Sequence, residues 1–323
     1  MTELRLSLPP ERLSIAAARE YGIELKFDWE HRDVLTGETN LGDVLADAGI
    51  DPGRVGSVHL PPGTERRGDR IGMAVTSSTR SAIVDFVYEQ LEVVPDATIV
   101  AHPPKRFQYA ELLGVIEGLL TATGREFAIE NAAVESNWYR PEELAFFAVA
   151  ADEEPTLDGL RLTVDSAHLP APRSGGRSLE SNRNSLEPDP DAIETLASRL
   201  REEGYALPNA YRERVVDRSP PEDPLTALDR ADPYAPLVRT LWLCGDRVRI
   251  VHLNDPVTDG VPEVDQHGGS DRHSQYGDRT GRDAVFEFIR GRDLALTLEP
   301  GDLLHSPTDL HRRFDALESL LRG

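Results

Sequence analysis

VRIVHLND (248–255) shows the pattern from which the architecture of this chain can be derived: a short Val- and Ile-rich run that ends in histidine and polar side chains. Apolar runs of this length predict buried strands. Histidine ends the runs VGSVHLP (55–61), ATIVAHP (97–103) and LRLTVDSAH (160–168), whereas glutamate ends EFAIEN (126–131) and LALTLEP (294–300). Polar groups at the same end of successive buried strands are unfavourable unless those ends converge on a common site.

Strand-like and helix-like segments alternate along the whole chain. Two earlier runs, LRLSL (4–8) and IELKFDW (23–29), bring the number of expected strands to eight. Helical patterns are expected at 14–21, 41–48, 77–91, 109–121, from residue 141, and at 192–203, 237–243, 282–289 and 307–321. This alternation predicts an α/β protein with a parallel sheet, and eight units predict a closed (β/α)8 TIM barrel.

The segment 169–247 is too long for one barrel crossover. It begins with PAPRSGGRSLESNRNSLEPDPD, which is poor in apolar residues and is typical of a surface loop. We therefore expect a single TIM-barrel domain over 1–323, with an insertion after the sixth strand at about 169–247.

The composition is strongly acidic. Asp and Glu number 57 against 35 Lys and Arg, the formal charge is −22, and the only lysines are Lys26 and Lys105. Such a composition resembles that of proteins from salt-loving archaea, and it disfavours a broad nucleic-acid footprint, which needs a basic face. The single cysteine, Cys244, excludes an internal disulfide and favours a reducing compartment. With no signal-peptide pattern and no long apolar span, we expect a cytoplasmic protein that does not contact a membrane.

The polar strand ends are candidate metal ligands, because active sites of such barrels form at the C-terminal ends of the strands. The candidates are His59, His102, Glu130, Asp165, His168, His252 and Glu299, joined by Asp271 and His273 from the loop after the seventh strand. Nitrogen and oxygen donors without sulfur favour Zn²⁺ or Mn²⁺. The set exceeds the needs of one ion and predicts two or three ions, with a carboxylate such as Glu130 bridging.

Each candidate also has a plain structural interpretation. A single histidine at a strand end is more often a hydrogen-bonded residue of the rim, and Asp165 with His168 could cap a helix. Asp265 and His267 repeat the D-x-H spacing of Asp271 and His273. The joint pattern over six consecutive strands is what favours a metal site.

These motifs resemble those of the xylose-isomerase-like barrels (the second family of abasic-site endonucleases), most closely endonuclease IV, over residues 55 to about 300. The shared elements are HLPPG at His59, AHPP at His102, IEN at Glu130, VDSAH at Asp165, HLND at His252, DRHSQYG at 271–277 and LEP at Glu299. The first strand lacks the start typical of endonuclease IV, and the insertion is far longer.

The resemblance implies a partition of the ligands over three zinc ions. One ion would be held by His59, His102 and Glu130, and a second by Glu130, Asp165, His252 and Glu299. The third would be held by His168, Asp271 and His273. The D-R-H triplet, which sugar isomerases of this superfamily usually lack, favours Asp271 and His273 over the upstream pair.

Three functions follow from these patterns. The first is metal-dependent hydrolysis of a phosphoester, including abasic-site DNA, with Glu130 bridging two ions, Glu299 orienting the attacking water and Arg272 clamping a phosphate oxygen. The second is a sugar or sugar phosphate isomerase or epimerase with one divalent metal, in which Glu130 and Glu299 shuttle a proton beside a carbonyl. The third is a binding barrel without catalytic activity. The acidic surface favours a small sugar over DNA. Oligomeric state is left open.

Overall fold

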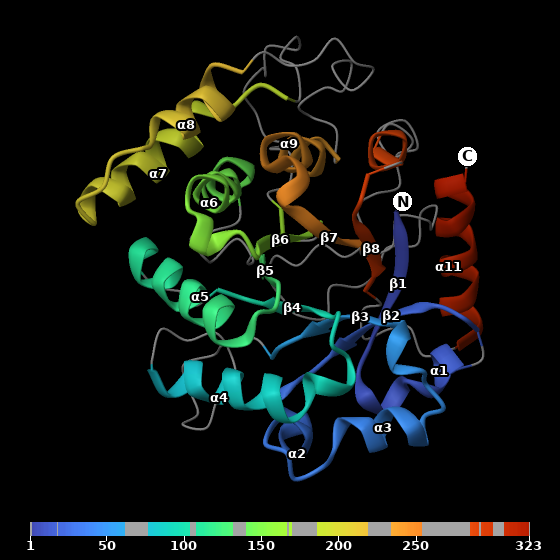
Figure 1. Ribbon diagram of the computed structural model, residues 1–323. Helices are drawn as coiled ribbons and strands as arrows, with labels where there is room; N and C mark the ends of the chain where they lie inside the picture. Colours follow the sequence, from blue (N-terminus) through green and yellow to red (C-terminus); the bar gives the residue numbers. More distant parts are fainter. Residues whose placement is uncertain are drawn as a thin grey trace.

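The computed structural model describes residues 2–17, 19–61, 77–103, 108–131, 140–166, 168–169, 186–218, 234–253, 285–290, 292–299 and 307–322. Its strands form one closed parallel barrel in the order of the sequence, from β1 to β8 (Figure 1). They are β1 (Glu3–Leu8), β2 (Gly22–Lys26), β3 (Val55–His59), β4 (Thr98–Ala101), β5 (Phe127–Glu130), β6 (Leu160–Asp165), β7 (Val248–Leu253) and β8 (Ala295–Leu298). The predicted (β/α)8 TIM barrel is confirmed.

The second strand is shorter than the strand-like run 23–29 predicts. The run continues to residue 29, whereas β2 ends at Lys26 and a 3-10 turn occupies Trp29–His31. The backbone N–H of Asp28 donates to His31 Nδ1 over 2.9 Å, and this local bond takes the place of ladder pairing. The early end of β2 leaves Lys26 at the rim of the barrel.

Helices cover the outside of the barrel, as the alternating pattern predicts (Figure 1). They are α1 (Ser14–Ala17), α2 (Arg32–Leu35), α3 (Leu41–Asp47), α4 (Ser77–Glu89), α5 (Tyr109–Thr123), α6 (Pro141–Glu153), α7 (Pro190–Glu202), α8 (Asn209–Tyr211), α9 (Ala235–Cys244) and α11 (Pro307–Arg322). The main core lies between these helices and the strands. None of the helices in the described ranges is long and apolar enough to span a bilayer.

The side chains inside the barrel form layers. Val100, Ala128, Ile250 and Ala295 make a small apolar cluster of their own, separate from the core beneath the helices. Because side chains alternate along a strand, the residues two positions further along β5 and β7 point into the same interior. They are Glu130 and His252, so the interior becomes polar toward the C-terminal ends of the strands.

The chain after β6 builds a second layer on one side of the barrel. α9 packs against α6, which places it where the crossover helix between β6 and β7 belongs. α7 and α8 contact the same α6 and lie outside it in Figure 1. α6 is consequently buried over almost its whole circumference, including two carboxylates, Glu142 and Glu143.

Ion pairs neutralise these two buried carboxylates. Arg239 of α9 places Nε 3.2 Å from Glu142 Oε1, and Arg199 of α7 donates to Glu143 Oε1 over 3.0 Å. Glu142 also accepts from the backbone N–H of Asp189 over 2.8 Å. The helices that follow β6 are thus held to the barrel by charge pairing as well as by apolar packing.

Replacing Arg239 with leucine should lower the free energy of unfolding by about 3 kcal/mol, because Glu142 would keep a buried charge without its counter-ion. Urea denaturation followed by circular dichroism measures the loss. The double variant with Glu142→Leu, which removes both charges, should recover part of that stability. An unchanged denaturation midpoint for Arg239→Leu alone would show that the pair does not hold α9 to α6.

Candidate metal centre

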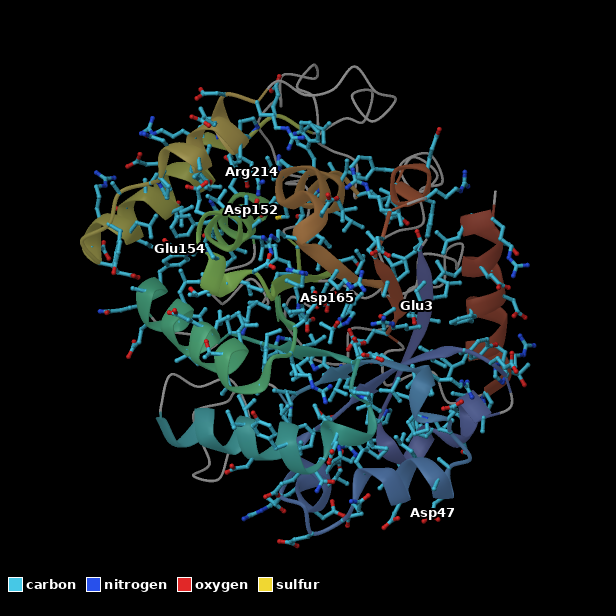
Figure 2. The ribbon with its side chains drawn as sticks, in the orientation of Figure 1. Glu3, Asp47, Asp152, Glu154, Asp165 and Arg214 are labelled. Atoms are coloured by element: carbon cyan, nitrogen blue, oxygen red, sulfur yellow. The ribbon has the colours of Figure 1, made fainter. Side chains whose placement is uncertain are left out.

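The predicted ligands meet at the C-terminal end of the barrel. Those within the described residues are His59, His102, Glu130, Asp165, His168, His252 and Glu299. Each stands at the end of its strand or directly after it, and parallel strands bring these ends to one face. Figure 2 labels Asp165 in the middle of the barrel. Asp271, Arg272 and His273, which the sequence also singled out, lie outside the described residues.

Glu130 is the centre of this cluster. Its Oε2 lies 2.6 Å from His59 Nε2 and 3.4 Å from His102 Nε2. Its Oε1 lies 3.3 Å from His252 Nδ1 and 3.8 Å from His168 Nδ1. One carboxylate, 1% exposed, therefore faces four imidazole rings that come from four different strand ends.

Two groups of side chains have the spacing that a metal ion needs, and Glu130 belongs to both. The outer group is His59, His102 and Glu130, and the inner group is Glu130, Asp165, His252 and Glu299. In each group the ligand atoms lie within 4.8 Å of one another. This matches the first two sites of the partition that the resemblance implies. His168 joins neither group, although its Nδ1 lies 3.3 Å from Asp165 Oδ2.

His252 provides a test of whether a metal fits the inner group. Its Nε2 is 3.0 Å from Glu24 Oε1, so Nδ1 faces Glu130 and, over 3.5 Å, Glu299 Oε2. Nδ1 is buried and makes no hydrogen bond to a described residue. A ring held through one nitrogen by a carboxylate, with the other nitrogen aimed at two carboxylates, is the arrangement of a metal-ligating histidine. The donor atoms of this group are oxygen and nitrogen, which suits Zn²⁺ or Mn²⁺.

The structure adds Glu24 to the site, a residue that the sequence interpretation missed. Glu24 is fully buried inside the barrel, where it accepts from Ser7 Oγ over 3.1 Å, from Ser57 Oγ over 3.0 Å and from His252 Nε2. These three bonds fix the direction of the carboxylate, which in turn fixes the imidazole ring of His252. Glu24 therefore positions the ring of His252 within the cluster.

Lys26, two residues further along β2, was missed as well. Its ammonium group forms an ion pair with Glu299. A signal was present in the sequence: in IELKF, the charged Glu24 and Lys26 alternate with the apolar Ile23, Leu25 and Phe27. Alternation places all the charges of a strand on one face, and in a barrel the apolar face packs against the helices. The charges must then point inward.

The electrostatics of the site favour ionised carboxylates. Burial acts to raise the pKa of Glu130, but His102, His252 and His59 outweigh it and hold the pKa well below its usual value. Burial also acts to raise the pKa of Glu299, but the charges of Lys26 and His252 outweigh it and lower the pKa. Asp165 differs, since burial raises its pKa despite the nearby His168.

The histidines fall into two classes. Burial lowers the pKa of His102 to about 3, so this ring is neutral at physiological pH and its nitrogen can act as a ligand. For His252 burial is outweighed by Glu24 and Glu130, which raise the pKa well above its usual value. Glu130 has the same effect on His59. Protons on these rings balance the buried carboxylates, and a divalent ion would take over that role on binding.

Comparison with known proteins adds little to this geometry. No protein-family model matches the chain, and no curated protein matches it. The fold is similar to that of protein SMc04130 from Sinorhizobium meliloti 1021, with a TM-score of 0.43 and 12% identity over 98% of each chain. It is also similar to a sugar phosphate isomerase/epimerase from Parabacteroides distasonis ATCC 8503, with a TM-score of 0.38 and 11% identity over 99% of this chain and 95% of that one. Similarity this low carries no activity from either protein to this chain.

Proposed function

We propose that this protein is a metal-dependent isomerase or epimerase that moves a proton beside the carbonyl group of a sugar or sugar phosphate. The supporting observation is the inner group, in which Glu130 and Glu299 flank His252 Nδ1 at 3.3 and 3.5 Å in a buried site. All members of this group lie within the described residues.

The inner group would hold one divalent ion, Zn²⁺ or Mn²⁺, through Glu130, Asp165, His252 and Glu299. Such an ion, when bound, would polarise the carbonyl and an adjacent hydroxyl of the substrate, which makes the C–H bond of the hydroxyl-bearing carbon more acidic.

Glu130 and Glu299 supply the proton transfer. A carboxylate oxygen takes the proton from the carbon next to the carbonyl, leaving an enediolate. Return of a proton to the neighbouring carbon, together with transfer of the hydroxyl proton to the former carbonyl oxygen, completes an isomerisation. Return of the proton to the opposite face of the same carbon completes an epimerisation. The pKa values of both carboxylates are lowered, which favours the ionised form that a base needs. At Glu299 the ion pair with Lys26 contributes to this lowering.

Two further side chains bind or orient the substrate. His168 Nδ1 lies 3.0 Å from the carbonyl oxygen of Asn131, and this contact orients its ring. Its Nε2 would hold a substrate oxygen. Lys26 is about one third exposed, so its ammonium group can approach the substrate while it holds Glu299. Lys26 would thereby stabilise negative charge on the enediolate oxygens.

Phosphoester hydrolysis is the second candidate, and one observation favours it. The outer group of His59, His102 and Glu130 has the spacing of a second metal site. A one-metal isomerase gives this group no task, whereas a hydrolase uses adjacent ions to activate water and to neutralise the phosphate.

Proton exchange with solvent distinguishes the two candidates. The full chain, loaded with Mn²⁺ or Zn²⁺, is incubated in D2O with a panel of ketoses and ketose phosphates and followed by proton NMR. We expect deuterium at the carbon next to the carbonyl, loss of exchange after chelation, and recovery when the metal is restored. Cleavage of an abasic-site oligonucleotide or of a phosphodiester, without exchange on any sugar, would reject the isomerase and support the hydrolase.

A further inference from the structure

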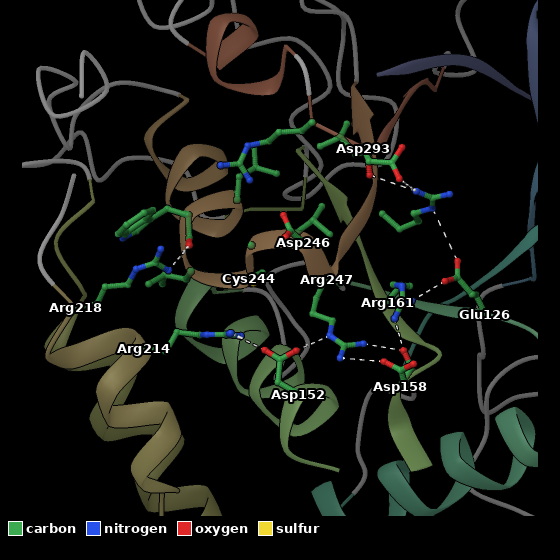
Figure 3. Close-up of a pocket in the computed structure, with 18 residues that line it drawn as sticks. Glu126, Asp152, Asp158, Arg161, Arg214, Arg218, Cys244, Asp246, Arg247 and Asp293 are labelled. Carbon is green, nitrogen blue, oxygen red and sulfur yellow. Dashed lines mark hydrogen bonds and ion pairs between the residues drawn. The ribbon is translucent and has the colours of Figure 1, made fainter. Parts of the chain in front are cut away.

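A second pocket lies on the face of the barrel opposite the candidate metal centre. It has a volume of about 900 Å³ and is formed by the segments that precede β5 to β8, by the C-terminal end of α9 and by the π-helical turn Arg212–Val216 with the residues after it (Figure 3). Val248, at the start of β7, lines the pocket, whereas His252 of the metal centre is four residues further on, about 13 Å along the strand. The two sites are therefore separate.

The lining of this pocket is unusually rich in arginine for so acidic a chain. Its arginines are Arg161, Arg214, Arg218, Arg247, Arg249 and Arg292. Its acidic residues are Glu126, Asp152, Asp158, Asp246 and Asp293. In the whole chain, acidic residues outnumber basic ones by 57 to 35. The sign of the charge balance is thus reversed at this pocket.

Most of the acidic groups are engaged at one side of the pocket. Asp152 lies between Arg247, at 2.7 Å, and Arg214, at 2.5 Å, as Figure 3 shows. Arg161 pairs with Glu126 over 2.8 Å, and in the same way Arg249 Nη1 lies 3.1 Å from Asp293. These pairs hold the segments that precede the strands in place.

Arg218 is held differently. Its guanidinium group lies over the indole ring of Trp242, with Cζ 3.5 Å from the ring centroid, and its Nη1 donates to the Trp242 carbonyl oxygen over 3.4 Å. No ion pair joins Arg218 to an acidic side chain of the described ranges. Stacking on an aromatic ring fixes the plane of a guanidinium and leaves its N–H edge available to an anion.

Positive charges gather around Arg218. Burial lowers its pKa, and the nearby Arg214 and Arg292 lower it further, which reflects repulsion among three guanidinium groups. Arg214 pairs with Asp152 through Nη2, while its Nη1 is buried and makes no hydrogen bond to a described residue. Arg292 is stacked in its turn on Phe288, with Cζ 4.0 Å from that ring. An anion between these groups would relieve the repulsion among the three guanidinium groups.

We propose that this pocket binds a phosphate-bearing small molecule, with Arg214, Arg218 and Arg292 around its phosphate group. Guanidinium forks match the oxygen spacing of phosphate and bind it in bidentate fashion. The volume exceeds that of a phosphate ion and lies toward the upper end of the range of small-molecule pockets, about 300–1,000 Å³. The ligand is therefore a phosphate ester or a diphosphate carried on an organic group. The proposal does not depend on the reaction at the metal centre.

Isothermal titration calorimetry on the full chain tests this site, with inorganic phosphate, pyrophosphate and a nucleoside diphosphate as probes at one fixed ionic strength. The metal is first removed by a chelator, so that the metal centre does not contribute. We expect saturable binding of pyrophosphate that is weakened about tenfold or more in Arg218→Gln, because a charge-assisted contact is lost. The relative affinities of pyrophosphate and the nucleoside diphosphate show whether the organic group is also bound.

The matched control is Arg201→Gln, which removes an exposed arginine of α7 whose ion-pair partner within the described part of the chain is the exposed Glu194. It changes the net charge equally and should bind pyrophosphate like the unmodified chain. Because Arg218 is exposed, both variants should unfold at the temperature of the parent, which thermal denaturation checks. Equal binding by Arg218→Gln, or no saturable binding by the unmodified chain, would overturn the proposal. The proposal would also be overturned if none of the phosphate probes bound and the chain instead self-associated in a way that Arg218→Glu abolishes.

Discussion

Replacing Glu130 with glutamine should reduce turnover by about 10³-fold, the range expected when an acid–base group is lost, and should also deplete the bound metal. Glu130 belongs to both ligand groups, so a single substitution weakens each of them. Glutamine keeps the size of the side chain but carries no charge and cannot accept a proton from the substrate. Turnover is measured by the exchange assay, and metal content by elemental analysis after dialysis against a weak chelator.

Two matched variants make this result specific. Glu117→Gln removes an exposed carboxylate of α5 and should leave both readouts unchanged. His102→Asn removes a ligand of the outer group only, so it should lower metal content less than Glu130→Gln does. If Glu130→Gln retained full activity and the metal content of the parent, Glu130 would be a structural residue and the proposed centre would be wrong.

Replacing Glu24 should change how metal affinity depends on pH, although Glu24 belongs to neither ligand group. Glu24 and Glu130 outweigh burial and raise the pKa of His252. A metal needs the neutral ring, so protons compete with it, and affinity rises as the pH increases through the pKa of His252. Glu24→Gln removes one negative charge and lowers that pKa. The rise in affinity should then occur at a lower pH.

A second substitution separates charge from orientation. Glu24→Leu removes the charge and also the acceptor that holds His252 Nε2 and the hydroxyls of Ser7 and Ser57. At pH 8.5, where proton competition is weaker, we expect Glu24→Gln to bind metal nearly as well as the parent. Glu24→Leu should bind it about 10- to 100-fold more weakly, the cost typical of losing a group that orients a ligand.

Metal affinity is measured at pH 6.5 and 8.5 by competition with a chelator of known affinity. The control is Thr297→Val, a substitution of equal size inside the same barrel, where the threonine hydroxyl makes no hydrogen bond to a described residue. Its pH profile should match that of the parent. A Glu24→Leu profile identical to the parent's would show that Glu24 neither charges nor orients His252.

Much of this protein could be predicted from local patterns. Runs such as VRIVHLND carry their own secondary-structure signal, and alternation with helical segments dictates a parallel sheet, which eight units close into a barrel. Because all parallel strands end at one face, the polar residues at the strand ends had to meet there. The structure brings together six of the side chains that were predicted in this way: His59, His102, Glu130, Asp165, His252 and Glu299.

The ends of elements were less predictable, because they depend on contacts outside the local run. The strand-like run that contains β2 continues to residue 29, whereas the strand ends at Lys26, and from Asp28 on the backbone N–H bonds locally to His31 instead of to a neighbouring strand. α9 lies within the segment 169–247 that the sequence predicts as an insertion, and it packs on α6 at the side of the barrel. Neither outcome is encoded in hydrophobic periodicity.

The sequence by itself determined the class of fold, the face on which the candidate site lies and the types of donor atom that it offers, because alternation and strand direction are local properties of the chain. Only the tertiary structure decided which side chains act together. Glu24 lies 228 residues from His252 in the chain, yet 3.1 Å from it in the barrel. Arg218, Arg214 and Arg292 likewise become one cluster only where segments before different strands meet. Such pairings depend on closure of the barrel in three dimensions, which brings together charges that have no relation in the linear sequence.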